Sequence, residues 1–154
     1  MKPKILAIVP ARAGSRRLPN KNIKLLNGLP LVAHTFEAIK KSEYINTTIV
    51  TSDCPEVLRI CQSYNNTSDK ASSIDVVLHA VEFAEKQIDE FDIVCLLQPT
   101  SPLRTSVDID TAISLLLEKK AKAVVSMSKC EHPPLWATKL DNKNDFGLFM
   151  KGLN

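Results

Sequence analysis

The 154-residue chain lacks the features that mark several large classes of protein. No apolar run approaches membrane-spanning length, and the run that follows the N-terminus has five residues, too few for a signal-peptide core. The four cysteines form no CxxC pair, so we expect reduced thiols that serve as small hydrophobes. These absences predict a cytoplasmic protein with no membrane partner, no disulfide framework and no cysteine-held metal.

Two further absences limit the possible ligands. Aromatic residues make up 5% of the chain, too few for a base-stacking platform, and the net charge is only +3. Neither the GxxxxGK[ST] motif of P-loop proteins nor the GxGxxG dinucleotide fingerprint is present. We therefore expect no nucleic-acid partner, and a nucleotide would need a site of another kind.

What the chain does contain is an alternation of strand-like and helix-like segments. Apolar or β-branched runs predict strands at 5–9, 47–51, 92–97 and 123–126. Apolar residues at helical spacing predict helices over 31–41, from Pro55, from a serine cap near Ser72 and from a cap at Ser106, with a loop at 65–71. This order predicts one α/β domain over 1–154, with three α/β/α layers around a mostly parallel, Rossmann-like sheet.

The stretch 5–22 dominates this pattern. A buried strand ends at Pro10 and leads into a loop that contains four cations and no acidic residue. Ligands of α/β folds bind where strands end, and these charges favour an anion, with phosphate as the first candidate. The small residues 13–15 let the backbone approach such a ligand closely. The charges alone leave open a second interpretation, a solvated basic loop with no ligand.

A second loop, QPTSPLR at 98–104, also follows a predicted strand directly. Its two prolines exclude regular secondary structure. Gln98 can both donate and accept hydrogen bonds, and Arg104 offers a guanidinium fork to an anion. Strands that run parallel place this loop beside the first one. The alternative is a proline-stiffened loop whose Arg104 pairs with a nearby acid.

The motif PARAGSRRLPNKN at 10–22 resembles the signature PARxGSKxxxxKN of the acylneuraminate cytidylyltransferases, the CMP-sialic acid synthetases. Further matches follow in family order: GLPL at 28–31, SD at 52–53, ASSID at 71–75, LQPTSPLR at 97–104 and HPP at 132–134. The first motif is most similar to the branch that activates bacterial nonulosonic acids such as legionaminic acid. The resemblance implies a nucleotide-diphospho-sugar transferase-like fold.

The resemblance also implies a reaction. Such an enzyme transfers CMP from CTP to the anomeric hydroxyl of a sialic-acid-like nonulosonic acid and releases pyrophosphate with Mg²⁺ assistance. Arg12 and Lys21 are then the expected catalytic residues, and Gln98 and Arg104 the expected sugar-binding residues. The expected nucleotide-binding set is Arg12, Gly14, Ser15, Arg16, Lys21, Asn22, Ser73 and Gln98. Arg16 replaces a family lysine, which keeps the charge and changes its geometry.

The chain departs from the family pattern in two places. The segment between residues 64 and 72 lacks an Arg-Pro pair that family members carry there. Family members also continue further, and the resemblance puts their Mg²⁺-binding aspartates and much of a homodimer interface beyond Asn154. No residue present is predicted to bind metal, because Asp108 and Asp110 are interpreted as acids that favour the start of a helix. We therefore expect these 154 residues alone to bind CTP weakly and to turn over poorly.

Two other functions remain open from the sequence. A relative that activates another sugar acid, such as deoxyoctulosonate, is disfavoured because that group carries an acidic residue in the loop corresponding to 98–104. A truncated or degenerate nucleotide-binding module would bind CTP without turnover.

Overall fold

The computed structural model describes residues 2–14, 18–64, 67–69 and 76–129. The chain divides into two compact units, Met1–Val124 and Val125–Asn154, and the elements below belong to the first. In chain order they are β1 (Ile5–Pro10), the 3₁₀ helix η1 (Lys21–Ile23), β2 (Leu25–Leu26), β3 (Leu29–Pro30), α1 (Leu31–Lys40), β4 (Thr47–Thr51), α2 (Pro55–Gln62), β5 (Thr67–Asp69), α3 (Val76–Gln87), β6 (Ile93–Leu96) and α4 (Ser106–Lys119). The prediction of one domain over 1–154 stays a prediction.

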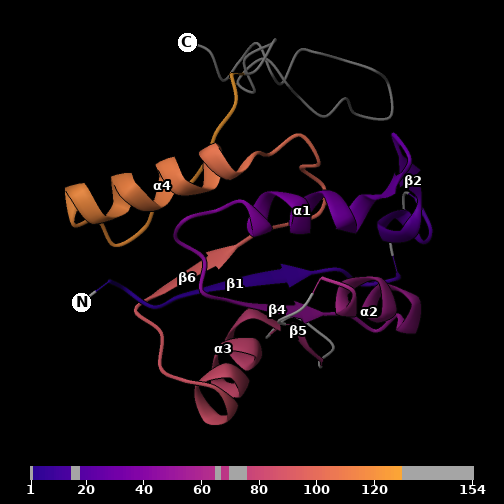
Figure 1. The fold of residues 1–154 in the computed structure, drawn as a ribbon, viewed down its shortest axis with the longest axis horizontal. Coiled ribbons are helices and arrows are strands. Elements are labelled where there is room, and N and C mark those ends of the chain that lie inside the picture. The colour runs from indigo at the N-terminus through magenta and orange to yellow at the C-terminus, as the bar shows by residue number, and fades with distance from the viewer. Residues whose placement is uncertain (1, 15–17, 65–66, 70–75, 130–154) are drawn as a thin grey trace, which may run out of the picture. The chain divides into compact units, whose positions relative to one another are not determined.

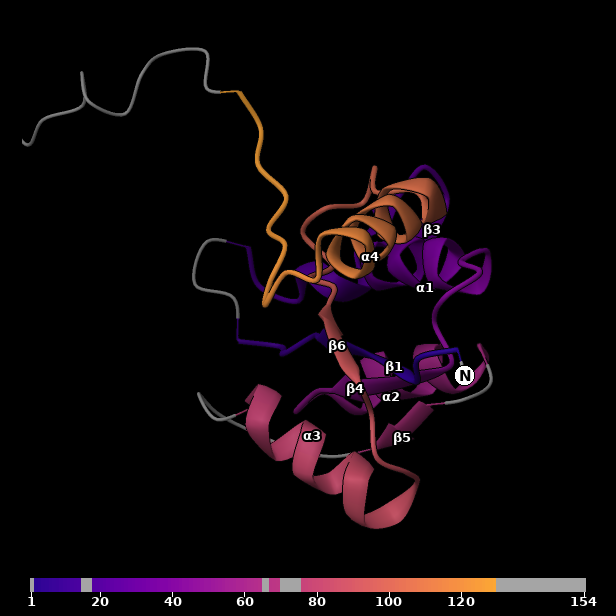
Figure 2. The same cartoon turned by 90° about the vertical axis from the view of Figure 1, so that its left-hand side faces the viewer.

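The central sheet has the strand order β5-β4-β1-β6, and every pairing in it is parallel. Helices α1 and α4 lie on one side of this sheet and α3 lies on the other (Figures 1 and 2). The predicted α/β fold with three layers and a parallel sheet is therefore confirmed.

Strand β1 holds the layers together because its side chains alternate between two cores. Ile5, Ala7 and Val9 join a cluster with buried residues of α1, α2 and α4. Leu6 and Ile8 join a second cluster with Ala80 and Ala84 of α3. All five strand residues are fully buried. This double burial explains why β1 reads as a continuous apolar run.

The segment 65–71, predicted to be a loop, contains a strand. Thr67–Asp69 forms β5 and pairs with β4 from Thr48↔Thr67 to Val50↔Asp69. Three polar residues do not form the apolar pattern from which a strand is predicted. They can still extend a sheet, because backbone hydrogen bonds alone hold the pairing. The predicted serine cap near Ser72 lies outside the described residues.

The start of α4 differs from the prediction by one residue. Thr105, and not Ser106, is the N-cap: its side chain accepts a hydrogen bond from the amide of Asp108. The Asp108 carboxylate in turn accepts one from the Thr105 amide at 2.7 Å, which completes a capping box. The same carboxylate also accepts from the Thr105 hydroxyl, and these bonds hold the pKa of Asp108 below its usual value. Asp108 is therefore a helix-start acid, as interpreted from the sequence.

The strand predicted at 123–126 is absent from the structure. These residues have no regular secondary structure and pair with none of the described strands. Their β-branched composition indicates only that the side chains would suit a pleated surface, and a strand also needs a partner.

A short hairpin follows the first loop. Strands β2 and β3 pair antiparallel around Asn27 and Gly28, whose φ angles are 49° and 82°. Two successive positive φ angles characterise the type I′ turn, which favours Asn-Gly. A hydrogen bond of 2.8 Å between Nε2 of His34 and the carbonyl of Leu26 ties the hairpin to α1.

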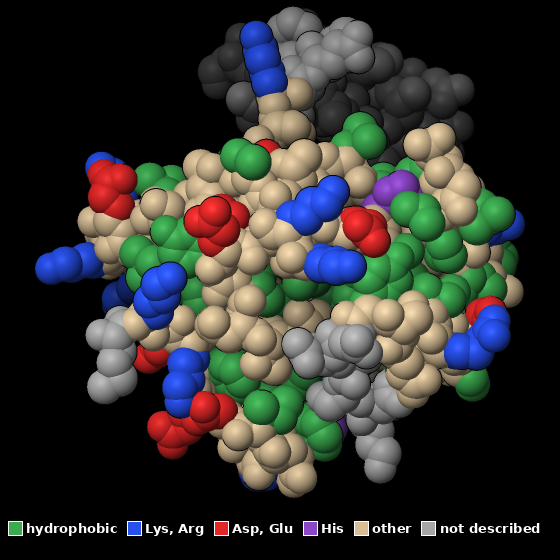
Figure 3. Space-filling model, viewed as in Figure 1, with side chains coloured by type: hydrophobic (Ala, Val, Ile, Leu, Met, Phe, Trp, Pro, Cys, Tyr) green, Lys and Arg blue, Asp and Glu red, His purple; other side chains and the backbone are tan. Residues whose placement is uncertain are grey.

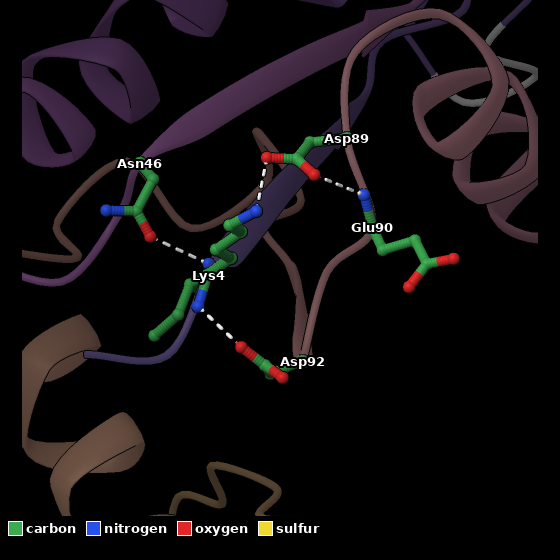
Figure 4. A network of polar contacts seen from close by, with 6 residues as sticks. Lys4, Asn46, Asp89, Glu90 and Asp92 are labelled. Atoms are coloured by element: carbon green, nitrogen blue, oxygen red, sulfur yellow. Dashed lines mark hydrogen bonds and ion pairs between the residues drawn. The ribbon is translucent and has the colours of Figure 1, made fainter. Parts of the chain in front are cut away.

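At the amino end of the sheet, side chains close a polar network around Lys4 (Figure 4). The Lys4 amide donates to Asp92 at 2.7 Å, and the Lys4 ammonium group pairs with Asp89. Asn46 accepts from the amide of Ile5, also at 2.7 Å. This network aligns the starts of β1, β4 and β6.

Charges of both signs share the surface of the face drawn in Figure 3. Lysine and arginine side chains lie interspersed with aspartate and glutamate side chains, and hydrophobic side chains lie between them. Recognition of a charged ligand on this face would depend on local groups and not on a broad field of one sign.

Candidate functional site

The loops that follow β1, β4 and β6 leave the sheet at the same end, where the carboxyl ends of these strands lie. They do so because β1 lies between β4 and β6 and runs parallel to both. The chain winds from β1 to β4 and β5 on one side and then returns to β6 on the other side. Open α/β sheets bind ligands at such a reversal, outside the carboxyl ends of the strands. The Leu97 amide donates to the Ile8 carbonyl at 2.9 Å, so residues 98–104 start beside the end of β1. The predicted adjacency of the two loops is confirmed.

The loop after β1 is bound to the end of β4 through its backbone. The amide of Ala11 donates to the carbonyl of Thr51 at 2.8 Å, and the hydroxyl of Ser52 donates to the carbonyl of Ala11 at 2.8 Å. The amide of Ala13 then donates to Oδ1 of Asp53 at 2.6 Å. These bonds fix the path of residues 11–13 across the carboxyl edge.

Asn22 holds the same loop from the other side. Its Nδ2 donates to the carbonyl of Arg12 at 2.9 Å, and the side chain is buried. Its Oδ1 is also buried and has no partner among the described residues. The side chain that was expected to contact the nucleotide therefore supports the backbone that carries Arg12. Its contact with a nucleotide stays a prediction.

Two of the four cations of the first loop, Arg12 and Lys21, lie among the described residues, and both are accessible to a ligand. Arg12 is exposed and Lys21 is half-buried, and neither forms an ion pair with another described residue. At Gly14 an added Cβ would meet no atom within 4 Å, so a ligand could approach the backbone there. Ser15, Arg16 and Ser73 belong to the predicted site and lie outside the described residues.

Arg104 forms hydrogen bonds with the backbone of its own loop, residues 98–104. Nη2 of Arg104 donates to the carbonyl of Gln98 at 2.8 Å, and the Arg104 amide donates to the carbonyl of Ser101 at 3.2 Å. Nη1 is buried with no partner among the described residues. Burial lowers the pKa of Arg104, and the nearby Cys95 and Asp108 partly offset that shift. The predicted alternative, a pairing of Arg104 with an acid, is not what the described residues show.

The described residues do not supply a metal site. Over residues 2–14, 18–64, 67–69 and 76–129, no group of three or more His, Cys, Asp or Glu side chains could hold a metal ion. Asp110 accepts hydrogen bonds from the hydroxyl of Ser42 and the amide of Glu43, which ties α4 to the turn after α1. Within that same part of the chain, no helix is long and apolar enough to cross a membrane.

Two residues that hold the first loop were missed as site residues from the sequence. Ser52 and Asp53 were read only as the end of a strand and as part of a family motif. A usable signal exists, since they are a polar pair directly after a strand that neighbours β1. Side chains in that position reach the same edge of a parallel sheet.

The fold and these contacts define a class, an α/β domain with a cationic, backbone-anchored loop at the carboxyl edge of a parallel sheet. Comparison with known proteins makes the class specific. The family described as cytidylyltransferase matches residues 6–146, and the chain belongs to that family.

Individual relatives agree with this assignment. The chain is 37% identical to the CMP-N,N'-diacetyllegionaminic acid synthase of Legionella pneumophila, over 92% of this chain and 65% of that protein. It is 36% identical to the N-acylneuraminate cytidylyltransferase of Escherichia coli (97% and 37%) and 30% identical to a pseudaminic acid cytidylyltransferase of Campylobacter jejuni (95% and 67%). The chain thus spans 37% to 67% of the length of these relatives. The resemblance to the acylneuraminate cytidylyltransferases is confirmed.

Solved structures support the fold. CMP:2-keto-3-deoxy-manno-octonic acid synthetase in complex with CTP is similar at a TM-score of 0.64 and 26% identity, over 77% of this chain and 49% of that one. A 4-diphosphocytidyl-2C-methyl-D-erythritol synthase from Anaerococcus prevotii shares the fold at a TM-score of 0.68 and 19% identity, over 92% of this chain and 61% of that one.

Proposed function

We propose that the protein transfers CMP from CTP to the anomeric hydroxyl of a sialic-acid-like nonulosonic acid and releases pyrophosphate. One observation carries the proposal. Arg12 and Lys21 lie at the carboxyl edge of a cytidylyltransferase-family sheet without an ion-pair partner among the described residues, on a loop whose backbone is anchored. Such a loop is suited to a triphosphate, which offers anionic oxygens to a guanidinium or ammonium group.

In this reaction the anomeric oxygen of the sugar acid attacks the α-phosphorus of CTP and forms a new P–O bond. The bond from the α-phosphorus to the bridging oxygen breaks, pyrophosphate leaves with the electron pair, and the hydroxyl proton passes to solvent. Phosphoryl transfer depends mainly on positioning and on neutralising charge. Arg12 and Lys21 would hold the phosphate oxygens and offset their charge as it develops.

The loop 98–104 suits the second substrate. Gln98 is exposed beside the first loop, and Arg104 is half-buried and pairs with no acid among the described residues. A sugar-acid carboxylate could form a charge-assisted hydrogen bond with its guanidinium group. We assign Gln98 and Arg104 to the sugar side of the site, with Gln98 also within reach of the nucleotide.

Several parts of the proposal rest on the resemblance and the sequence. We propose that Mg²⁺ assists the departure of pyrophosphate. A homodimer and a cytoplasmic location are proposed on the same basis. The single domain over 1–154 is likewise a proposal.

A pyrophosphate-release assay tests the function. It uses CTP, Mg²⁺ and four acids: N-acetylneuraminic, legionaminic, pseudaminic and deoxyoctulosonic acid. Release with any of the first three supports the proposal. Release with deoxyoctulosonate alone would replace the substrate class. Slow release is the expected result for these 154 residues, and CTP binding with no release above background would indicate a non-catalytic module. A protein of these 154 residues that forms CMP-sugar rapidly would contradict the expectation of poor turnover.

A further inference from the structure

We propose that Asp53 is a positioning residue for nucleotide binding. Its carboxylate accepts the amide hydrogen of Ala13 and so fixes the loop that presents Arg12. The inference rests on the proposed function, since it concerns how the same loop meets CTP.

The geometry places Arg12 between two anchors. On the β4 side, Asp53 holds Ala13, the residue after Arg12, at 2.6 Å. On the η1 side, Asn22 holds the carbonyl of Arg12 itself at 2.9 Å. The Arg12 side chain stays exposed while its backbone is bonded on both sides. The residue that Asp53 holds, Ala13, directly precedes Gly14, where the space over the backbone is open.

A carboxylate is an unexpected group at this place. A negative charge close to a bound triphosphate opposes binding by Coulomb repulsion. Direct attraction of CTP therefore does not account for Asp53. A carboxylate that accepts an amide hydrogen makes a stronger bond than a neutral acceptor does, and that bond holds the loop. An asparagine would keep an acceptor oxygen in the same place and remove the repulsion.

The test compares three substitutions at Asp53 by calorimetric titration with CTP. D53A removes the acceptor and should weaken binding about tenfold or more, since a displaced loop misplaces Arg12. D53E keeps the charge but moves the oxygen by one methylene, and should also weaken binding. D53N keeps the oxygen and loses the charge, and should bind within about threefold of the wild type or more tightly.

Asp92 supplies a matched control. Its Oδ2 accepts the amide hydrogen of Lys4 at 2.7 Å, the same type of contact at the opposite end of the sheet. D92A should lower the melting temperature and leave the CTP dissociation constant within about threefold, because it removes one structural hydrogen bond far from the loop.

The outcomes separate the inference from the function. Wild-type affinity in D53A overturns the positioning role. Weak binding in D53N equal to that of D53A also overturns it, because the charge and not the acceptor would then matter. If D53A does not fold, the comparison of D53N with D53E decides.

If the wild type binds no CTP, the proposed function fails and the CTP role of Asp53 fails with it. Amide exchange at Ala13 then tests the anchor alone: it should be slow in the wild type and D53N and faster in D53A, and equal rates would refute the anchor.

Discussion

The two ends of β1 use polar groups in opposite ways. At the amino end, the Lys4 ammonium meets Asp89, and acceptor side chains cover the amides of Lys4 and Ile5. At the carboxyl end, side chains again bond the backbone, with Asp53 as an acceptor and Asn22 as a donor, but the cations Arg12 and Lys21 pair with no described acid. The first end is closed and the second is open to an anion. This difference is the reason why we propose the carboxyl end as the functional end.

The energetic contributions of the closed end are uneven. The Lys4–Asp89 pair is exposed, and such surface pairs contribute little to stability. The bond from Asn46 to the Ile5 amide matters more, because Ile5 is fully buried and its amide would otherwise lack a partner. The closed end is thus mainly a set of backbone anchors.

The largest effect should come from Arg12. R12A removes a charge from the open end and should weaken CTP binding by about a hundredfold, with R12K intermediate because it keeps charge and loses the fork. Titration calorimetry measures both. K4A, which removes a cation from the closed end, should leave the affinity within about threefold. Equal effects of R12A and K4A would break the comparison.

A smaller effect on the second substrate is expected at Arg104. R104M should raise the sugar-acid concentration for half-maximal pyrophosphate release about ten- to a hundredfold, because a charge-assisted donor to the carboxylate is lost. The CTP dissociation constant, measured separately, should change by less than about threefold, because no phosphate contact is removed. A parallel loss of CTP affinity would place Arg104 on the nucleotide instead.

At the closed end, N46A should lower the free energy of unfolding by about 1–3 kcal/mol, since it leaves the buried Ile5 amide unpaired. Urea denaturation measures the change. CTP affinity per folded molecule should be preserved, and a large loss would mean that the two ends are coupled.

The smallest effect is a pH dependence of stability. The hydrogen bond from Lys4 holds the pKa of Asp89 below its usual 3.8, so this stabilisation is present above that pH and is lost as the pH falls through the lowered value. Asp108, whose pKa is also lowered, acts in the same direction. D89N should therefore show a shallower fall in melting temperature below about pH 4 than the wild type. Identical acid profiles would show that the pair contributes nothing.

The sequence predicted the parts of the fold that depend on burial or on strand direction. Strand β1 was recognised because both of its faces are buried, and the adjacency of the first loop to residues 98–104 followed from parallel pairing. Two predictions were wrong in opposite senses. Residues 67–69 were predicted to be loop and form strand β5, whereas residues 123–126 were predicted to be a strand and have no regular secondary structure. In both segments, pairing with a neighbouring strand decided the secondary structure, and composition did not.

The position of Ser52 and Asp53 after a strand could have marked them as site residues, but their hydrogen-bond partners could not be read from local sequence patterns. Ala13 and Asp53 are 40 residues apart, so their hydrogen bond leaves no periodicity to detect. Asn22 was expected at the nucleotide because its motif resembles a family signature, and its bond to the Arg12 carbonyl became visible only in the fold.

The most direct test is a titration of the ¹⁵N-labelled protein with CTP, followed by amide chemical shifts. The account predicts the largest changes at residues 11–14, 21–22, 52–53 and 98–104, and none above background at 4–5, 46 and 89–92. Changes centred on the Lys4 network, or no changes at millimolar CTP, would contradict it.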